Sequence, residues 1–114
     1  MHELSIAQAI VNQAKDLLAK EGANRIIRIS LSIGVLSGIE EHALNQAFPI
    51  AAEGTPVEGA KLEIEVVEAS VFCNDCNAEV TVTPPFMVCG TCMGSNVDIR
   101  KGRDMIIKQM EIVA

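Results

Sequence analysis

Two C-x-x-C motifs, Cys73 to Cys76 and Cys89 to Cys92, restrict what this chain can form more than any other part of it. Each motif can present two thiolates to one ion, and four thiolates suit the tetrahedral coordination of zinc. A redox dithiol needs only one such motif, at the start of a helix, so two matched motifs favour metal binding over disulfide exchange. Four thiolates also leave no coordination position for water. The spacing therefore predicts a structural zinc on Cys73, Cys76, Cys89 and Cys92.

Regular elements flank the cysteine segment, residues 70–100. Apolar residues at three- and four-residue spacing predict helices over residues 4–20 and 40–53. Pro49 removes an amide donor, so we expect the second helix to kink or to end early, near Phe48. Alternation of apolar and polar residues predicts three strands, at residues 25–34, 62–66 and 105–112.

The order of these elements predicts an α+β fold, with two helices packed on a three-stranded sheet. A zinc-knuckle subdomain, similar to a zinc ribbon, is inserted between strands 2 and 3 of that sheet. We expect one α/β domain from residues 1–69 and 101–114, and the zinc-binding subdomain from residues 70–100. A segment of about 30 residues is too small to bury its own core, so the metal should supply part of its folding free energy. Within it, short strands are expected near residues 80–83 and 86–88.

The charge of the chain excludes some classes of partner. The formal net charge is −6, and the chain has no Trp or Tyr. Both properties disfavour a nucleic-acid-binding surface. No run approaches the roughly 20 apolar residues of a membrane span, and the first residues do not resemble a signal peptide, so we expect a cytoplasmic protein without a membrane segment. No nucleophile and base stand out as a hydrolase constellation, and no enzyme activity is predicted.

The N-terminus is a second concentration of metal-ligand chemistry. A terminal amine, the amide of residue 2 and the imidazole of His2 can close fused chelate rings, and such nitrogen-rich sites suit Ni(II) or Cu(II). On residue types alone, a His at position 2 is more often a frayed terminal side chain, and Glu3 is an acid that favours a helix N-terminus.

The whole pattern resembles the HypA/HybF family of hydrogenase nickel-incorporation proteins. The resemblance runs essentially from end to end, and its most specific parts are Met1-His2-Glu3-Leu4-Ser5-Ile6, Ile33-Gly34-Val35-Leu36-Ser37-Gly38-Ile39-Glu40 and the two C-x-x-C motifs. It implies a nickel metallochaperone that binds Ni(II) at its N-terminus. It also implies that a HypB-type GTPase helps to deliver this nickel to the large subunit of nickel-iron hydrogenase, and that some members assist urease maturation.

The resemblance assigns roles to particular residues. It makes His2 the principal nickel ligand, with Glu3 and the Met1 amine as further donors, and it places Glu40 near the nickel. The alternative for Glu40 is a carboxylate that complements the dipole of the second helix. We expect a monomer or a weak homodimer. The competing hypothesis is a zinc-ribbon interaction module with no nickel role, which would tolerate loss of His2.

Overall fold

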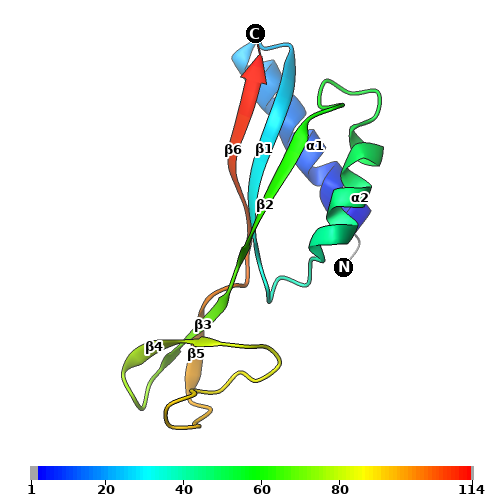
Figure 1. Cartoon of the computed structure of the whole chain (residues 1–114). Coiled ribbons are helices and arrows are strands. Elements are labelled where there is room, and N and C mark those ends of the chain that lie inside the picture. Colours follow the sequence, from blue (N-terminus) through cyan, green and yellow to red (C-terminus); the bar gives the residue numbers. More distant parts are fainter. Residues whose placement is uncertain (1–2, 114) are drawn as a thin grey trace. The chain divides into compact units, whose positions relative to one another are not determined.

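The computed structural model of the 114-residue chain describes residues 3–113 and divides into two compact units. Among these residues, the helix unit comprises 3–31, 39–65 and 107–113, and the cysteine unit comprises 32–38 and 66–106. Figure 1 shows the elements of both.

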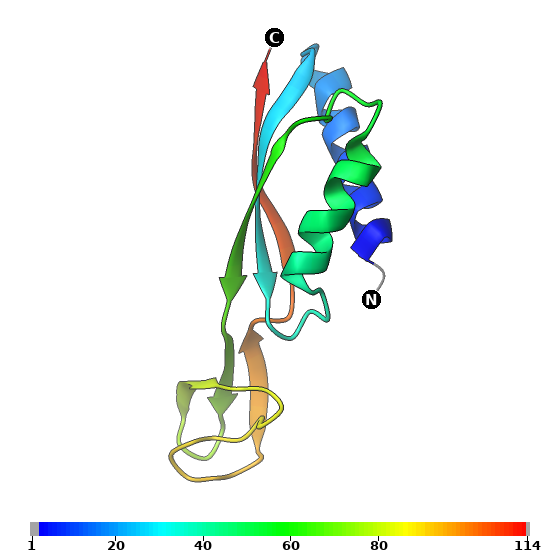
Figure 2. The same cartoon turned by 45° about the vertical axis from the view of Figure 1, so that its right-hand side comes forward.

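Two helices, α1 (Glu3–Glu21) and α2 (Glu41–Ala52), contact each other in the helix unit. Figure 2 shows them side by side on one face of the sheet. The apolar stripe of α1 that the periodicity predicts is buried, and it consists of Ala7, Ile10, Val11, Ala14 and Leu18. Both helices therefore form because each has an apolar face to bury.

The expected early end of α2 is wrong. The helix continues through Pro49 to Ala52, and Pro49 itself is exposed. Phe48 and Ala52 lie on the opposite, buried face, at 3% and 1% exposure. Burial of these two side chains outweighs the hydrogen bond that proline removes, because most helical stability in a protein comes from packing.

The sheet of three strands has the order β2-β1-β6 and confirms the predicted segments. Its strands are β1 (Arg25–Gly34), β2 (Lys61–Val67) and β6 (Met105–Val113). Ile29, Leu31 and Ile33 are buried in the central strand, as the alternation predicts. Ile27 departs from it, since Ile26 is buried in its place and Ile27 is 37% exposed.

The cysteine unit contains a second sheet, of order β4-β3-β5. Its strands are β3 (Ala69–Cys73), β4 (Ala78–Val82) and β5 (Val97–Lys101). Strand β3 is central and pairs antiparallel with both neighbours. The expected strand over residues 86–88 is wrong, because only the isolated bridge between Thr83 and Phe86 forms there.

Buried residues of this second sheet form a small core of Ala69, Val71 and Val82. With two helices, a three-stranded sheet and a cysteine segment between β2 and β6, the chain has the predicted α+β fold.

Candidate metal centre

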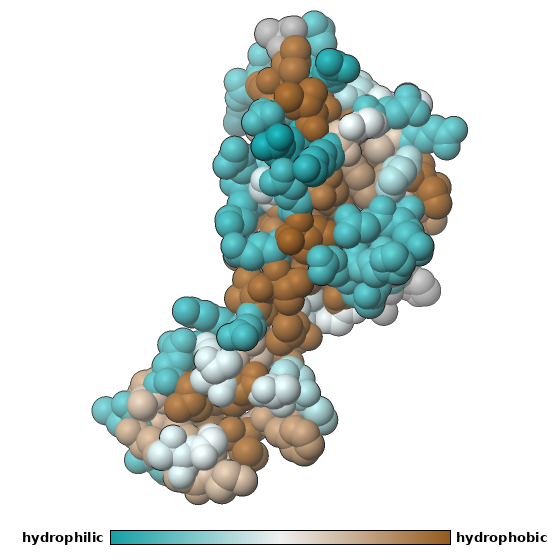
Figure 3. All heavy atoms as spheres, in the orientation of Figure 1, coloured by the Kyte–Doolittle hydropathy of each residue, from teal (hydrophilic) through white to brown (hydrophobic). Residues whose placement is uncertain are grey.

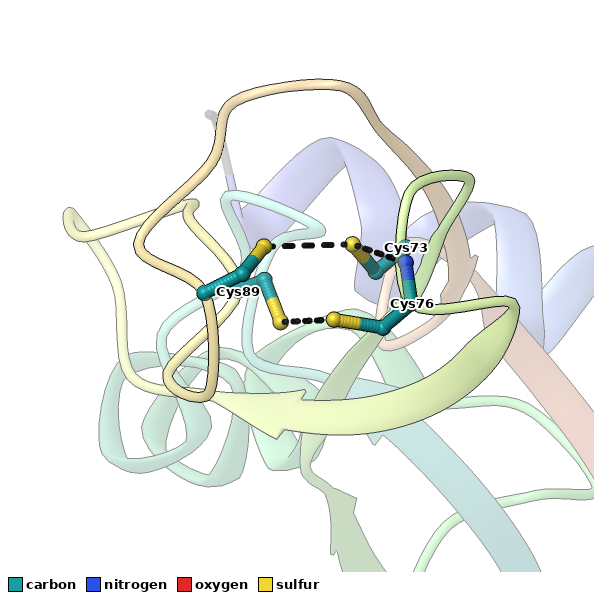
Figure 4. A group of neighbouring side chains, drawn as sticks. Cys73, Cys76 and Cys89 are labelled. Atoms are coloured by element: carbon teal, nitrogen blue, oxygen red, sulfur yellow. Dashed lines mark hydrogen bonds between the residues drawn. The ribbon is translucent and has the colours of Figure 1, made fainter.

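Four thiols meet at the end of β3. The sulfur atoms of Cys73, Cys76, Cys89 and Cys92 all lie within 4.8 Å of one another. The Cys73 and Cys92 sulfurs are 3.7 Å apart, and the Cys76 and Cys89 sulfurs are 3.9 Å apart. Figure 4 shows the labelled side chains of Cys73, Cys76 and Cys89 pointing toward a common centre. The two motifs that the sequence separates therefore form one site.

The spacing of the sulfurs fits a zinc ion. A tetrahedral site with zinc–sulfur bonds of about 2.3 Å places its sulfurs about 3.8 Å apart. The separations of the two sulfur pairs, 3.7 and 3.9 Å, lie on either side of that value. The donor set is all sulfur, which selects zinc or another thiophilic metal over magnesium or calcium.

Each motif turns sharply, and backbone groups hold the turns. In the first, the Cys76 amide donates to the Cys73 sulfur at 3.3 Å. In the second, the Met93 amide donates to the Cys89 carbonyl at 2.7 Å, and the Cys89 amide donates to the Gly94 carbonyl at 3.0 Å. Met93 has a φ of 60°, in the left-handed region, as the reversal of the chain requires.

The electrostatics of the four thiols favour a bound cation. Backbone amides of Cys92 and Thr91 lower the pKa of the Cys89 thiol to about 6. Hydrogen bonding with the side chains of Cys92, Cys73 and Cys89 raises the pKa of the Cys76 thiol to about 12. Without a cation, one thiolate thus suppresses ionisation of its neighbours. A divalent metal removes this conflict, because it binds all four as thiolates.

A polar network that the sequence did not reveal ties the first motif to β5. The Asn74 side-chain amide donates to the carboxylate of Asp98 at 3.1 Å and to the side chain of Asn96 at 3.3 Å. The Asn96 side-chain amide donates to the carboxylate of Asp75 at 3.3 Å. Asn and Asp within a C-x-x-C motif were the available signal, but their partners lie more than 20 residues away and only the fold brings them together.

The proposed nickel residues fall partly outside the described chain. Met1 and His2 lie outside the residues that the structure describes. The Glu3 carboxylate accepts a hydrogen bond from the Glu40 backbone amide at 3.2 Å. The Glu40 carboxylate accepts one from the Ala43 amide and so serves as the N-cap of α2. Glu3 and Glu40 therefore meet where α1 and α2 begin.

No helix among residues 3–113 is long and apolar enough to cross a lipid bilayer.

Comparison with known proteins assigns the family. The family described as HypA, hydrogenase/urease nickel incorporation metallochaperone, matches residues 1–112. A protein of Chloroflexus aurantiacus named hydrogenase maturation factor HypA is 48% identical over 112 residues, which cover 97% of this chain and 98% of that protein. The protein of the same name from Aquifex aeolicus is 37% identical, over 98% of this chain and 97% of its own length.

Solved structures agree with this assignment. The solution structure of the Ni metallochaperone HypA from Helicobacter pylori matches with a TM-score of 0.70 and 26% identity, covering 100% of this chain and 99% of that one. These names describe a metallochaperone and maturation factor rather than an enzyme. With the family match covering nearly every residue and the four thiols gathered in one site, this chain belongs to the HypA family of hydrogenase/urease nickel-incorporation metallochaperones.

Proposed function

We propose that this protein binds Ni(II) through His2 and delivers it, with a HypB-type GTPase, to the large subunit of nickel-iron hydrogenase. The match of the nickel-incorporation family to residues 1–112 carries this proposal. The chain has no Gly-rich phosphate loop of its own, so the energy for delivery comes from the partner. Urease is the second possible client, since the family description names both enzymes.

The nickel donors that we propose are nitrogen and oxygen atoms near the N-terminus. They are the His2 imidazole, the Met1 amine, Glu3 and, in a supporting role, Glu40. The hydrogen bond between the Glu3 carboxylate and the Glu40 amide supports this choice, because it joins the start of α1 to the start of α2. Nitrogen and oxygen donors are harder than thiolates and suit Ni(II). This difference in donor type directs nickel to the N-terminus rather than to the four cysteines.

The four cysteines hold a structural zinc in this proposal. The separations between their sulfurs fit a tetrahedral ion, and a closed shell of four thiolates leaves no position for water. We assign nickel binding to the domain of residues 1–69 and 101–114, and zinc binding to residues 70–100. All four cysteines are free thiols, which suits a reducing cytoplasm. We propose a monomer or a weak homodimer.

Nickel titration by calorimetry tests the proposal. Zinc-loaded wild type should bind about one nickel with micromolar or tighter affinity. His2→Ala should lose that binding and keep its zinc, as measured by metal analysis before and after the titration. Equal nickel binding by both proteins, or by neither, would leave the zinc-ribbon interaction module as the better account.

A second variant tests the amine separately from the imidazole. Adding Gly-Ser before Met1 moves the amine and leaves His2 in place. We expect nickel affinity to fall at least about tenfold, because a chelate ring is lost. An unchanged affinity would exclude the Met1 amine as a donor without excluding His2.

A further inference from the structure

The outer surface of the helix layer carries no charge over much of its length. Charged residues make up 21% of the chain, yet residues 4–14 of α1 and 42–52 of α2 contain no Asp, Glu, Lys or Arg. The exposed side chains in these two stretches are amides, a hydroxyl, an imidazole and apolar groups. We call them the uncharged helix surface, and it consists of Leu4, Ser5, Gln8, Ala9, Asn12, Gln13, His42, Asn45, Gln46, Pro49 and Ile50.

The two stretches lie together. α1 and α2 contact each other, and the hydrogen bond from the Glu40 amide to the Glu3 carboxylate joins their first turns. Figure 2 shows the helices running in the same direction from this end. The first half of α1 and residues 42–52 of α2 therefore lie next to each other on the helix layer.

A helix face that only meets water normally carries charged as well as polar residues, and other exposed parts of the helix unit do so. The last turns of α1 expose Lys15, Asp16, Lys20 and Glu21, and the sheet carries the ion pairs Arg28–Glu63 and Lys108–Glu65. By contrast, Ile50 on α2 is 65% exposed. Figure 3 shows apolar atoms at the surface near the end of α2, beside hydrophilic atoms nearer its start. Depletion of charged residues is one of the features that distinguish the centre of a protein interface from the rest of a protein surface.

We propose that the uncharged helix surface is the docking site of the HypB-type GTPase, and that this partner meets it with a surface that is also uncharged. This inference rests on the proposed function. The surface adjoins the first turns that hold Glu3 and Glu40, so a partner seated on it is next to the proposed nickel donors.

The absence of charge on the uncharged helix surface favours a partner protein over other occupants. Nucleic acids and anionic membranes require cations, and these stretches have none. Two copies of this chain, each with a formal charge of −6, repel each other. A different protein with an uncharged contact surface meets neither obstacle.

Matched alanine-to-lysine substitutions on one helix test the docking site. Ala9 and Ala19 are both exposed on α1, but only Ala9 lies on the uncharged helix surface. The probe is the purified HypB-type GTPase of the same organism, and its affinity is measured by calorimetry. Ala9→Lys, and Gln46→Lys on α2, should weaken binding at least about tenfold, because each places an unpaired charge in the interface. Ala19→Lys should change it less than about twofold.

Salt dependence, circular dichroism and nickel binding complete the test. Wild-type affinity should change less than about threefold between 50 and 300 mM NaCl, because no charges pair across the interface. The variants should keep the helical signal and nickel affinity of the wild type. Equal weakening by Ala9→Lys and Ala19→Lys, or no weakening by Ala9→Lys and Gln46→Lys, would overturn the proposal.

Three further results separate this inference from the proposed function and from a second copy as the occupant. Wild type that binds nickel but not the GTPase would overturn the docking site and leave the nickel site standing. A wild-type dimer that Ala9→Lys dissociates, with GTPase binding unchanged, would show that a second copy occupies the surface and would overturn the choice of partner. Wild type that binds the GTPase but does not bind nickel would contradict the nickel site and support the docking surface.

Discussion

Gly94 shows how closely single residues are fitted around the four sulfurs. A Cβ atom added at Gly94 would lie 3.1 Å from the Cys92 sulfur and 3.4 Å from a carboxylate oxygen of Asp75. A Cβ atom added at Gly90, inside the second C-x-x-C motif, would meet no other atom within 4 Å. Neither glycine has a positive φ, so the difference between them is one of space rather than of backbone conformation.

We therefore predict that Gly94→Ala weakens zinc binding about tenfold, because the added methyl group displaces the Cys92 sulfur from its position in the site. Gly90→Ala should change zinc affinity less than about twofold. Competition with a chromophoric chelator measures both affinities. Equal effects of the two substitutions would show that space at residue 94 does not limit the metal geometry.

The ligand types at both candidate sites could be read from residues, but their hydrogen bonds could not. C-x-x-C spacing is local, so the four thiols were predicted together, and the structure gathers them in one site. Glu40 was predicted either as a residue near the nickel or as an acid at a helix start. The structure shows it capping α2, and its part in nickel binding stays a proposal. The contact of Glu3 with Glu40 spans 37 residues and has no local signal.

At the scale of elements, the periodicity of apolar residues predicted the helices and strands that bury an apolar face. It did not predict all the strands of the cysteine unit. Helices α1 and α2 and strands β1, β2 and β6 were predicted, since their apolar patterns are long. Strands β3 and β5 were not, because each has only five residues, which is too short for a clear apolar pattern. The early end predicted at Pro49 was wrong because the burial of Phe48 and Ala52 is a tertiary effect.

Pro49 yields a prediction about α2. Pro49→Ala restores an amide that can donate to the Asn45 carbonyl and removes the clash of the ring with the preceding turn. The free energy of unfolding should rise by about 1 kcal/mol or more. Gln46 is another exposed position of α2, and Gln46→Ala should change the free energy of unfolding by less than about 0.5 kcal/mol. Urea unfolding measures both. A loss of stability in Pro49→Ala would mean that the ring makes contacts of greater value than the hydrogen bond.

Within the cysteine unit, Gly102 permits three backbone segments to meet. A Cβ atom at Gly102 would lie 2.7 Å from the Ala69 Cα, and one at Gly34 would lie 2.1 Å from the Gly102 carbonyl carbon. The Leu36 amide donates to the Gly102 carbonyl at 2.6 Å. A side chain at either glycine is therefore incompatible with this crossing.

Gly59 provides the control for Gly102. Both have a positive φ, 82° and 95°, but an added Cβ at Gly59 meets nothing within 4 Å. Gly59→Ala should cost about 1 kcal/mol through backbone conformation alone. Gly102→Ala should cost about 2 to 4 kcal/mol, because a steric clash is added. Urea unfolding of the zinc-loaded proteins compares them, and equal losses would contradict the close crossing.

At the scale of the whole molecule, the two units differ in how much core each can bury. The helix unit buries large side chains from both helices and the central strand, among them Ile10, Ile29 and Phe48. The core cluster of the cysteine unit is smaller: three buried residues, Ala69, Val71 and Val82, have the partly buried Leu36, Val80, Met87 and Val97 packed against them. Two of the cysteines are also buried. So small a core does not offset the entropy of ordering three strands and their loops. In the proposed function, a metal held by the four cysteines supplies the difference.

Removal of zinc should therefore unfold the cysteine unit and leave the helix unit folded. Hydrogen exchange after treatment with a zinc chelator measures this residue by residue. Amides of β3, β4 and β5 should exchange within about tenfold of the rate of an unstructured chain. Amides of α1 and of residues 25–31 in β1 should keep the protection of the zinc-loaded protein, because their core contains no metal ligand. Restoring zinc should restore protection in β3 to β5, which separates metal loss from irreversible oxidation of the thiols. If α1 lost protection together with β3, the two units would be one cooperative structure, and zinc would support the nickel-binding part of the chain as well as its own.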